Sequence, residues 1–200
     1  MNKIVVWAVI GFVIAVLVSG GLSFMMVSVG ARPGFAPIMV GGFLGVFVAY
    51  IGGNLAGNRR TPKASGAQRD AALSLTPASD QALLIVYREG FVGMAAGMNV
   101  VLDGRPVAQL KSPRFTALSI PAGDHGLQLG FGGLARAQNR DSEWRFTAAP
   151  GEVVAFRAVM AMGALKNAIQ VVRVESASSV ELDALRTKLS GVAMTAPDVA

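Results

Sequence analysis

The sequence contains no cysteine in its 200 residues. This absence excludes disulfide bonds, zinc–thiolate sites, iron–sulfur clusters, a cysteine nucleophile and a lipid-modified cysteine. It leaves the compartment open, because many domains of oxidising compartments also lack disulfides.

Histidine is nearly as scarce, with His125 as the one example. A histidine metal site needs further ligands, and the carboxylates are scattered along the chain. Asp124 precedes His125, but adjacent residues of a strand point to opposite faces, so they form no ready acid–base pair. The sequence also has no nucleophile elbow, phosphate-binding loop or paired-carboxylate motif. We therefore expect no catalytic residue, metal or cofactor, and predict that the protein is not an enzyme.

Charged residues make up 15% of the chain, and the formal net charge is +6. The dense basic run is Arg59, Arg60 and Lys63, directly after a long apolar stretch. A nucleic-acid-binding domain would carry a basic stripe on its folded surface, whereas residues 80–175 are nearly balanced in charge. The run is instead typical of a topology signal that binds lipid headgroups. We expect membrane lipid as a partner and no nucleic acid.

Apolar sequence is abundant, at 52% of all residues. Residues 4–29 and 34–58 carry no charged side chain, and a short connection around Arg32 separates them. About 20 apolar residues cross a hydrocarbon core of roughly 30 Å. We therefore predict a membrane α-hairpin of two transmembrane helices over residues 4–58. A cleaved signal peptide is the alternative for the first stretch, but its apolar run is long and a second run follows at once.

Basic residues at the ends of the apolar stretches predict the topology. Lys3 precedes the first stretch, Arg59, Arg60 and Lys63 follow the second, and Arg32 alone lies in the turn. Basic residues near helix ends are retained on the cytoplasmic side. We predict a two-pass protein of the bacterial inner membrane with both termini in the cytoplasm.

Small residues recur every four positions in both apolar stretches, a pattern that resembles the glycine zippers of membrane-inserting hairpins. Small residues let helix backbones approach closely, which matters in lipid because no hydrophobic drive brings helices together. Two interpretations stay open: contact within one hairpin, which we favour, or a further role in a homo-oligomer. The predicted helix-packing positions are Gly11, Ala15 and Ser19 in the first stretch and Gly41, Gly45, Ala49, Gly53 and Gly57 in the second.

The rest of the chain divides into a linker, a β domain and a C-terminal segment. Residues 59–79, rich in Ala, Ser, Thr, Pro and Arg, predict a flexible basic linker. Frequent turns and the absence of β-α-β alternation predict an all-β antiparallel sandwich over residues 80–175. A capping-box spacing and one leucine face predict a C-terminal helix over residues 178–191, with a disordered tail over residues 192–200. The predicted strands are residues 81–88, 98–103, 106–111, 114–120, 125–131, 143–147, 153–162 and 167–175.

The turn motifs of this domain follow one another in a characteristic order. A first strand ends in Tyr87 and Arg88, a hairpin turn follows at Asp103 and Gly104, and residues 121–129 contain a turn of the form Pro-x-Gly-x-His. In this order they resemble a small bacterial β-sandwich domain of unknown function that is common in envelope lipoproteins and akin to PEGA-type surface domains. The resemblance implies a non-catalytic domain in which Asp103, Gly104, Pro121, Gly123 and His125 are fold residues of the turns. Those lipoproteins face outward on a lipidated cysteine, whereas this chain has a two-helix anchor instead.

Two functions follow from these patterns. The first is a non-catalytic interaction or scaffold protein that presents a β-sandwich at the membrane to a protein partner or to copies of itself. The alternative is an outward-facing envelope module that binds a glycan or a lipid headgroup. Phe91, Met94 and Met98 lie near the loop after the first strand, either as an apolar patch for a partner or as core, and core is the favoured interpretation.

Overall fold

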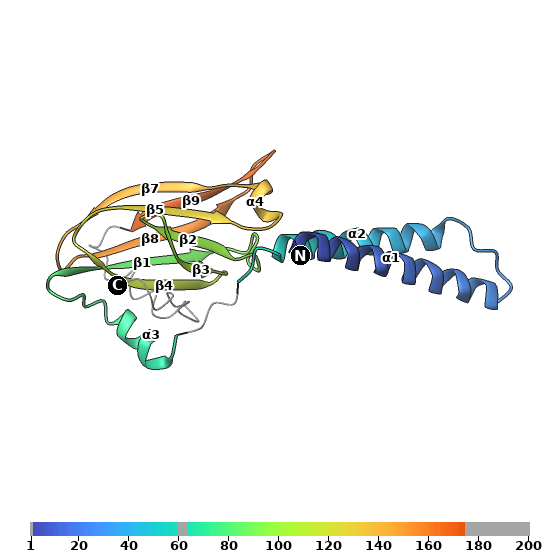
Figure 1. Ribbon diagram of the computed structural model, residues 1–200, viewed down its shortest axis with the longest axis horizontal. Helices are drawn as coiled ribbons and strands as arrows, with labels where there is room; N and C mark the ends of the chain where they lie inside the picture. The colour runs from blue at the N-terminus through green and yellow to red at the C-terminus, as the bar shows by residue number, and fades with distance from the viewer. Residues whose placement is uncertain (1, 60–63, 175–200) are drawn as a thin grey trace. The chain divides into compact units, whose positions relative to one another are not determined.

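The computed structural model describes residues 2–59 and 64–174 (Figure 1). These residues form two compact units. The helical unit comprises Met1–Gly57 with Gly133–Ala135, and the β unit comprises Asn58–Gly132 with the chain from Arg136 onward. Arg60, Lys63, the predicted helix over residues 178–191 and the tail over residues 192–200 lie outside the described residues.

The helical unit contains two long helices, α1 (Lys3–Ser28) and α2 (Ala36–Leu55). The side chain of Asn2 caps α1 by accepting a hydrogen bond from the backbone N–H of Ile4 at 3.0 Å. A proline in the first turn of α2 suits that position, because the amide it lacks has no partner within the helix. Both helices are long and apolar enough to cross a membrane, with mean hydropathies of 2.6 and 1.8. The prediction of two long apolar helices at the N-terminus is confirmed.

The β unit is mostly β structure in two sheets. One sheet has the strand order β4-β1-β8-β9-β6 and the other has the order β3-β2-β5-β7. The elements are α3 (Gly66–Leu73), β1 (Gln81–Glu89), β2 (Met98–Leu102), β3 (Arg105–Leu110), β4 (Arg114–Pro121), β5 (Gly123–Phe131), α4 (Ala135–Gln138), β6 (Asn139–Arg140), β7 (Ser142–Ala148), β8 (Val153–Ala161) and β9 (Asn167–Val174). The predicted strands therefore match observed ones, while α4 and β6 occupy a segment without a predicted element.

The sheets are not purely antiparallel, which corrects the predicted topology. Strand β1 pairs with β4 in the antiparallel direction but with β8 in the parallel direction, and β6 pairs with β9 in parallel. Local turn signals report only hairpins between consecutive strands. They carry no information about the direction in which β1 meets a strand some 70 residues later in the chain.

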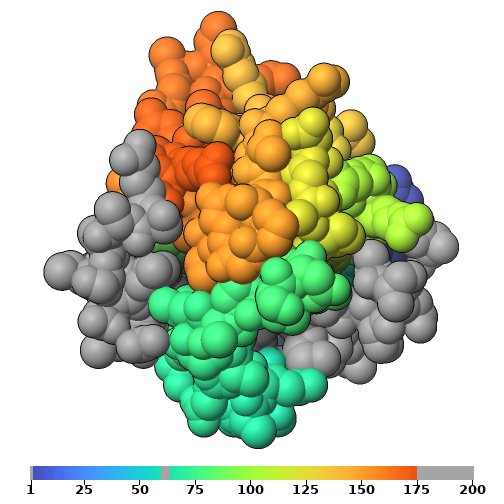
Figure 2. Space-filling view, turned by 90° about the vertical axis from the view of Figure 1, so that its left-hand side faces the viewer, coloured from blue at the N-terminus to red at the C-terminus, as the bar shows by residue number. Residues whose placement is uncertain are grey.

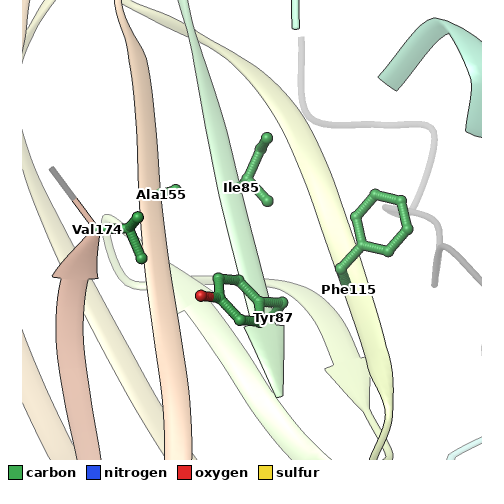
Figure 3. Packing of buried hydrophobic residues seen from close by; sticks show 5 residues of the cluster. All are labelled: Ile85, Tyr87, Phe115, Ala155 and Val174. Atoms are coloured by element: carbon green, nitrogen blue, oxygen red, sulfur yellow. The ribbon is translucent and has the colours of Figure 1, made fainter. Parts of the chain in front are cut away.

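Strand β1 is buried on both faces, which explains why its sequence is an almost continuous apolar run. One face contributes Ile85 and Tyr87 to a cluster with Phe115 of β4, Ala155 of β8 and Val174 of β9 (Figure 3). The other face points toward the second sheet, where the guanidinium of Arg88 lies 5.0 Å from the ring centroid of Phe131 on β5.

Part of the predicted linker packs against this cluster. The helix α3 begins with a capping box, in which Ser65 accepts a hydrogen bond from the backbone N–H of Gln68, and the Gln68 side chain accepts one from Ser65. Ala72 and Leu73 of α3, together with Leu75, pack on the cluster. Residues 64–75 are therefore a covering element of the β unit, which corrects the expectation of a flexible tether over this stretch.

Aromatic side chains join the two sheets, with Phe146 and Phe156 buried between them and Trp144 partly exposed at the surface. The rings of Phe146 on β7 and Phe156 on β8 meet edge to face with centroids 5.1 Å apart. Trp144 on β7 lies 6.1 Å from the same Phe156 ring. Such geometries add to the stabilisation that burial of the rings provides.

Candidate functional site

The backbones of α1 and α2 approach each other closely at three glycines of the helical unit. Gly11, Gly41 and Gly45 are buried although most of the two helices is exposed. A methyl group added at Gly11 would lie 2.8 Å from the Cβ of Ala49 and closer still to the carbonyl oxygen of Gly45. These backbones therefore meet at distances that side chains larger than glycine do not permit.

The same contact continues toward the turn. A methyl group added at Gly41 would lie 2.6 Å from the carbonyl oxygen of Ala15 and 2.8 Å from the backbone nitrogen of Ser19. One added at Gly45 would lie 2.7 Å from the Cβ of Ala15. The structure thus brings Gly11, Ala15, Ser19, Gly41, Gly45 and Ala49 together between the two helices of one hairpin.

Gly53 and Gly57 have other surroundings. Gly53 faces the side chain of Leu134, within the same unit, rather than α1. Gly57 lies two residues beyond Leu55, where α2 ends, so it is outside the helix to which the repeat assigned it. The i+4 spacing missed Gly52, which lies against the indole ring of Trp7 on α1. At this end of the hairpin, the glycine of α2 that contacts α1 is therefore Gly52 rather than the predicted Gly53.

The helices separate near the turn, where an apolar cleft of about 380 Å³ opens between them. Large side chains, among them Leu22, Met25 and Met26 of α1, replace the small residues here. The small-residue pattern therefore ends where the close contact ends.

Of the predicted lipid-headgroup residues, the structure describes Arg59. Its side chain is exposed, and its backbone N–H donates a hydrogen bond of 2.7 Å to the side-chain oxygen of Gln109. The Arg59 side chain is thus exposed to solvent at the point where the chain enters the β unit.

The predicted turn residues form one hydrogen-bonded cluster. Asp103 and Gly104 have positive φ values of 50° and 76°, as a tight hairpin turn requires. The Asp103 carboxylate accepts a hydrogen bond from the Gly126 N–H at 2.7 Å, and its second oxygen lies 2.7 Å from Nδ1 of His125. The other ring nitrogen of His125 lies 2.9 Å from the carbonyl oxygen of Pro121. The imidazole therefore ties the turn after β2 to the turn before β5.

Both partners of the His125 ring accept hydrogen bonds, so both ring nitrogens must donate. That arrangement belongs to the protonated imidazolium. Burial alone would lower the pKa of His125, but the hydrogen bonds to Asp103 and Pro121 and the negative charges of Asp103 and Asp124 raise it. Burial alone would raise the pKa of Asp103. The hydrogen bonds from Gly126 and His125, together with the positive charges of His125 and Arg105, lower it, and the net shift of this pKa is downward.

A surface pocket of about 580 Å³ lies beside this cluster, lined by residues of β5 and β7. His125 and Phe146 form one side, with ring centroids 5.6 Å apart, and Arg145 and Thr147 lie nearby. The turn between β4 and β5 and the turn between β7 and β8 lie side by side on this end of the β unit, as the pairing of Gly123 with Ala148 requires (Figure 2).

This cluster offers little for catalysis or metal binding. Both nitrogens of the imidazole are engaged within the fold. Within residues 2–59 and 64–174, no group of three or more His, Asp and Glu side chains gathers to hold a metal ion. The pair acts as a cross-link between two turns.

Arg88 is a buried structural residue to which the sequence patterns assigned no hydrogen-bonding role. Its side chain is fully buried, and burial lowers its pKa to about 10. Nη1 donates to the carbonyl oxygens of Ala96 at 2.5 Å and Leu110 at 3.2 Å, and Nη2 donates to that of Gly93 at 2.7 Å. A lone charged residue in an apolar strand was the available signal, since burial of such a residue requires acceptors within the fold. Here the acceptors serve Nη1 and Nη2, while the buried Nε has no hydrogen-bond partner among the described residues.

No family model matches this chain, and no curated protein matches its sequence.

Proposed function

We propose that this chain is a membrane-anchored interaction protein whose helical unit spans a bacterial inner membrane and whose β unit, a β-sandwich, is presented at the membrane surface. The observation that carries the proposal is the outer surface of α1 and α2. Large apolar side chains such as Phe12, Phe24 and Phe43 are about 70% exposed there. Apolar patches of this extent on a folded protein mark a membrane or a partner.

The charges at the helix ends support a cytoplasmic β unit. Lys3 is the first residue of α1, and Arg59, Arg60 and Lys63 follow α2 in the sequence, while Arg32 alone lies between the two helices. The cytoplasmic placement follows the positive-inside bias.

For the interaction we propose a protein partner at the pocket beside His125. The pocket combines an aromatic ring, Phe146, with an exposed guanidinium, Arg145, and such combinations are enriched where proteins bind one another. The engaged imidazole supports a non-catalytic role. Because the small residues of the hairpin face each other, we propose that they stabilise the anchor itself rather than a homo-oligomer.

Paired cysteine reporters test the anchoring and the topology together. The chain has no native cysteine, so Ala31→Cys in the turn and Ala122→Cys in the β unit, both exposed, report cleanly. In intact cells, a membrane-impermeant thiol reagent should label Ala31→Cys and reach Ala122→Cys only after lysis. The reverse result would favour the outward-facing envelope module that the resembling lipoproteins suggest. Equal labelling of both sites would contradict a spanning hairpin.

The partner surface has its own test. Cross-linking in intact cells and purification in mild detergent should recover a protein with the wild type and lose it with Arg145→Glu. The control is Arg136→Glu, another exposed arginine, which should retain the partner. Equal recovery with both variants would place the partner elsewhere.

A further inference from the structure

Four large apolar side chains of the β unit point into solvent from two loops. Phe91 and Met94, in the loop 90–97, are 85% and 40% exposed. Met162 and Leu165, in the loop 162–166, are 79% and 95% exposed. Phe91 and Met94 thus do not belong to the core, contrary to the favoured expectation, whereas Met98 is fully buried. We call these four side chains the apolar end of the β unit.

The strand pairing places both loops at the same end of the sheet. Strands β1 and β8 are parallel neighbours with Glu89 opposite Val159, so the chain leaves both strands in the same direction. The right-hand end of the β domain in Figure 1 shows the loop after β1 and the turn between β8 and β9. The apolar side chains of both loops therefore project from the same end of the β unit.

The exposure of Phe91 is built into the fold. Gly90 and Gly93 adopt positive φ values of 95° and 63°, which turn the loop outward from β1. The buried Arg88 then holds the carbonyls of Gly93 and Ala96. A buried cation whose donors are used to fix a surface loop indicates that the position of the loop matters, because burial of a charge is costly.

Charge is distributed unevenly between the two ends of the β unit. At the apolar end the loops and strand ends carry six basic side chains and three acidic ones, all at least partly exposed. The basic ones are Arg59, Lys111, Arg114, Arg136, Arg140 and Lys166, and the acidic ones are Glu89, Asp141 and Glu143. The opposite end carries four carboxylates and two arginines. They are Asp80, Asp103, Asp124 and Glu152, and Arg105 and Arg173. The apolar end is thus the positive end.

Asn58, which follows α2 closely in the sequence, is hydrogen-bonded to a loop of the apolar end within the β unit. The side chain of Asn58 donates to the carbonyl oxygen of Ala95 at 3.0 Å and accepts from the backbone N–H of Gly97 at 2.6 Å. Asn58 follows Leu55, the last residue of α2, by three positions. Because a residue spans at most about 3.6 Å, the loop 90–97 is tethered roughly 11 Å of chain from the end of α2.

We propose that the apolar end of the β unit inserts into the interfacial layer of the bilayer, with its basic side chains on anionic lipid headgroups. This inference rests on the proposed membrane anchorage of α1 and α2. Exposed apolar side chains ringed by cations are the composition that binds an anionic membrane surface. The short tether from α2 favours lipid over a protein partner, since a loop held so close to the exit of a span meets the headgroup layer first.

Cysteine reporters in lipid nanodiscs test this contact. We would label Phe91→Cys or Leu165→Cys of the full chain with an environment-sensitive fluorophore, in nanodiscs of phosphatidylcholine and phosphatidylglycerol containing a lipid-borne quencher. Phe43→Cys, on the exposed face of α2, is the positive control for anchoring. Ala122→Cys, at the opposite end of the β unit, is the negative control.

The proposal predicts quenching at positions 43, 91 and 165 that is several-fold stronger than at position 122. Quenching at 91 and 165 should weaken when phosphatidylglycerol is replaced by phosphatidylcholine, because the basic side chains then lose their partners. Quenching at position 43 without quenching at 91 and 165 overturns the inference and leaves the anchor intact. Absence of quenching at position 43 overturns both, because the helices are then not in the bilayer.

A second variant separates insertion from mere proximity. With the reporter at Met162→Cys, Leu165→Asn should reduce lipid quenching several-fold, while Leu165→Ile should preserve it. Both changes lie at a 95% exposed side chain, so neither should disturb folding. Equal quenching with Asn and Ile would show that the loop lies near the membrane without inserting, and would overturn the proposal.

Discussion

The packing inside the helical unit uses small residues, whereas the packing inside the β unit uses large ones. Between α1 and α2 the contacts run through Gly11, Gly41 and Gly45, where backbone meets backbone. Between the two sheets they run through rings such as Phe156, which is fully buried. In lipid, association depends on close van der Waals approach, whereas in water it depends on the apolar area removed from solvent. The two packing styles are therefore those expected of helices in lipid and of sheets in water.

Removing a ring from the β unit should have the largest effect. Phe156→Ala takes away a side chain that contacts both Phe146 and Trp144, and such truncations destabilise by about 3–5 kcal/mol. Urea unfolding followed through the fluorescence of Trp144, in a Trp7→Phe background, measures the change. Phe91→Ala is the matched control, because an 85% exposed ring should change stability by less than about 0.5 kcal/mol. Similar midpoints for the two variants would refute the assigned core.

Arg88 sharpens the comparison, since it is a polar anchor inside the apolar unit. Arg88→Met should destabilise the β unit by about 1–3 kcal/mol, because the carbonyls of Gly93, Ala96 and Leu110 lose their donors. Hydrogen exchange should rise mainly in the loop 90–97. Arg88→Lys keeps the charge but not the planar fork, so it should also loosen the loop. Unchanged exchange in this loop would show that Arg88 does not hold it.

The His125–Asp103 pair should have the smallest effect, because Asp103 is 45% exposed. The raised pKa of His125 means that its contribution is full below about pH 6.5 and is lost as pH rises through its folded pKa. The lowered pKa of Asp103 means that its contribution is full above about pH 3.8 and is lost as pH falls through its folded pKa. The pair thus stabilises most between these values, by less than about 1 kcal/mol.

Asp103→Asn should lower the pKa of His125 and flatten this pH dependence. Asparagine also tolerates the positive φ of this position, so the turn should persist. As the chain has one histidine, NMR titration of its ring protons measures the shift directly. Asp80→Asn is the control and should leave the pKa of His125 unchanged. An unchanged His125 pKa in Asp103→Asn would contradict the pairing.

The features that could be predicted from the sequence are those that depend on residues close together in the chain. Apolar runs without charge located α1 and α2, and alternation between turn residues located the strands. The small residues that meet in the hairpin, among them Gly11 and Gly45, also follow from a local repeat. The repeat wrongly placed Gly57 in the helix, because a spacing of small residues does not indicate where a helix ends.

The remaining features depend on contacts between distant residues. The parallel pairing of β1 with β8 has no local signature. Asp103 and His125 meet because β2 pairs with β5, with Leu102 opposite Leu127, and neither turn motif contains that register. The exposure of Phe91 depends on Arg88 and two glycines acting together. The helix α3 was the exception, because the capping box at Ser65 and Gln68 was present in the sequence and was missed.

The contrast in packing can be tested most directly on two glycines of α2 that lie three positions apart. Gly45 meets α1, whereas a side chain at Gly42 would meet nothing within 4 Å. In a Trp144→Phe background, Trp7, which packs on Gly52, is the single fluorescent reporter of helix contact. The account predicts that Gly45→Val, by overpacking worth about 1–3 kcal/mol, exposes Trp7 to quenching by brominated lipid, while Gly42→Val does not. Equal quenching in the two variants would contradict a hairpin held together by its small residues.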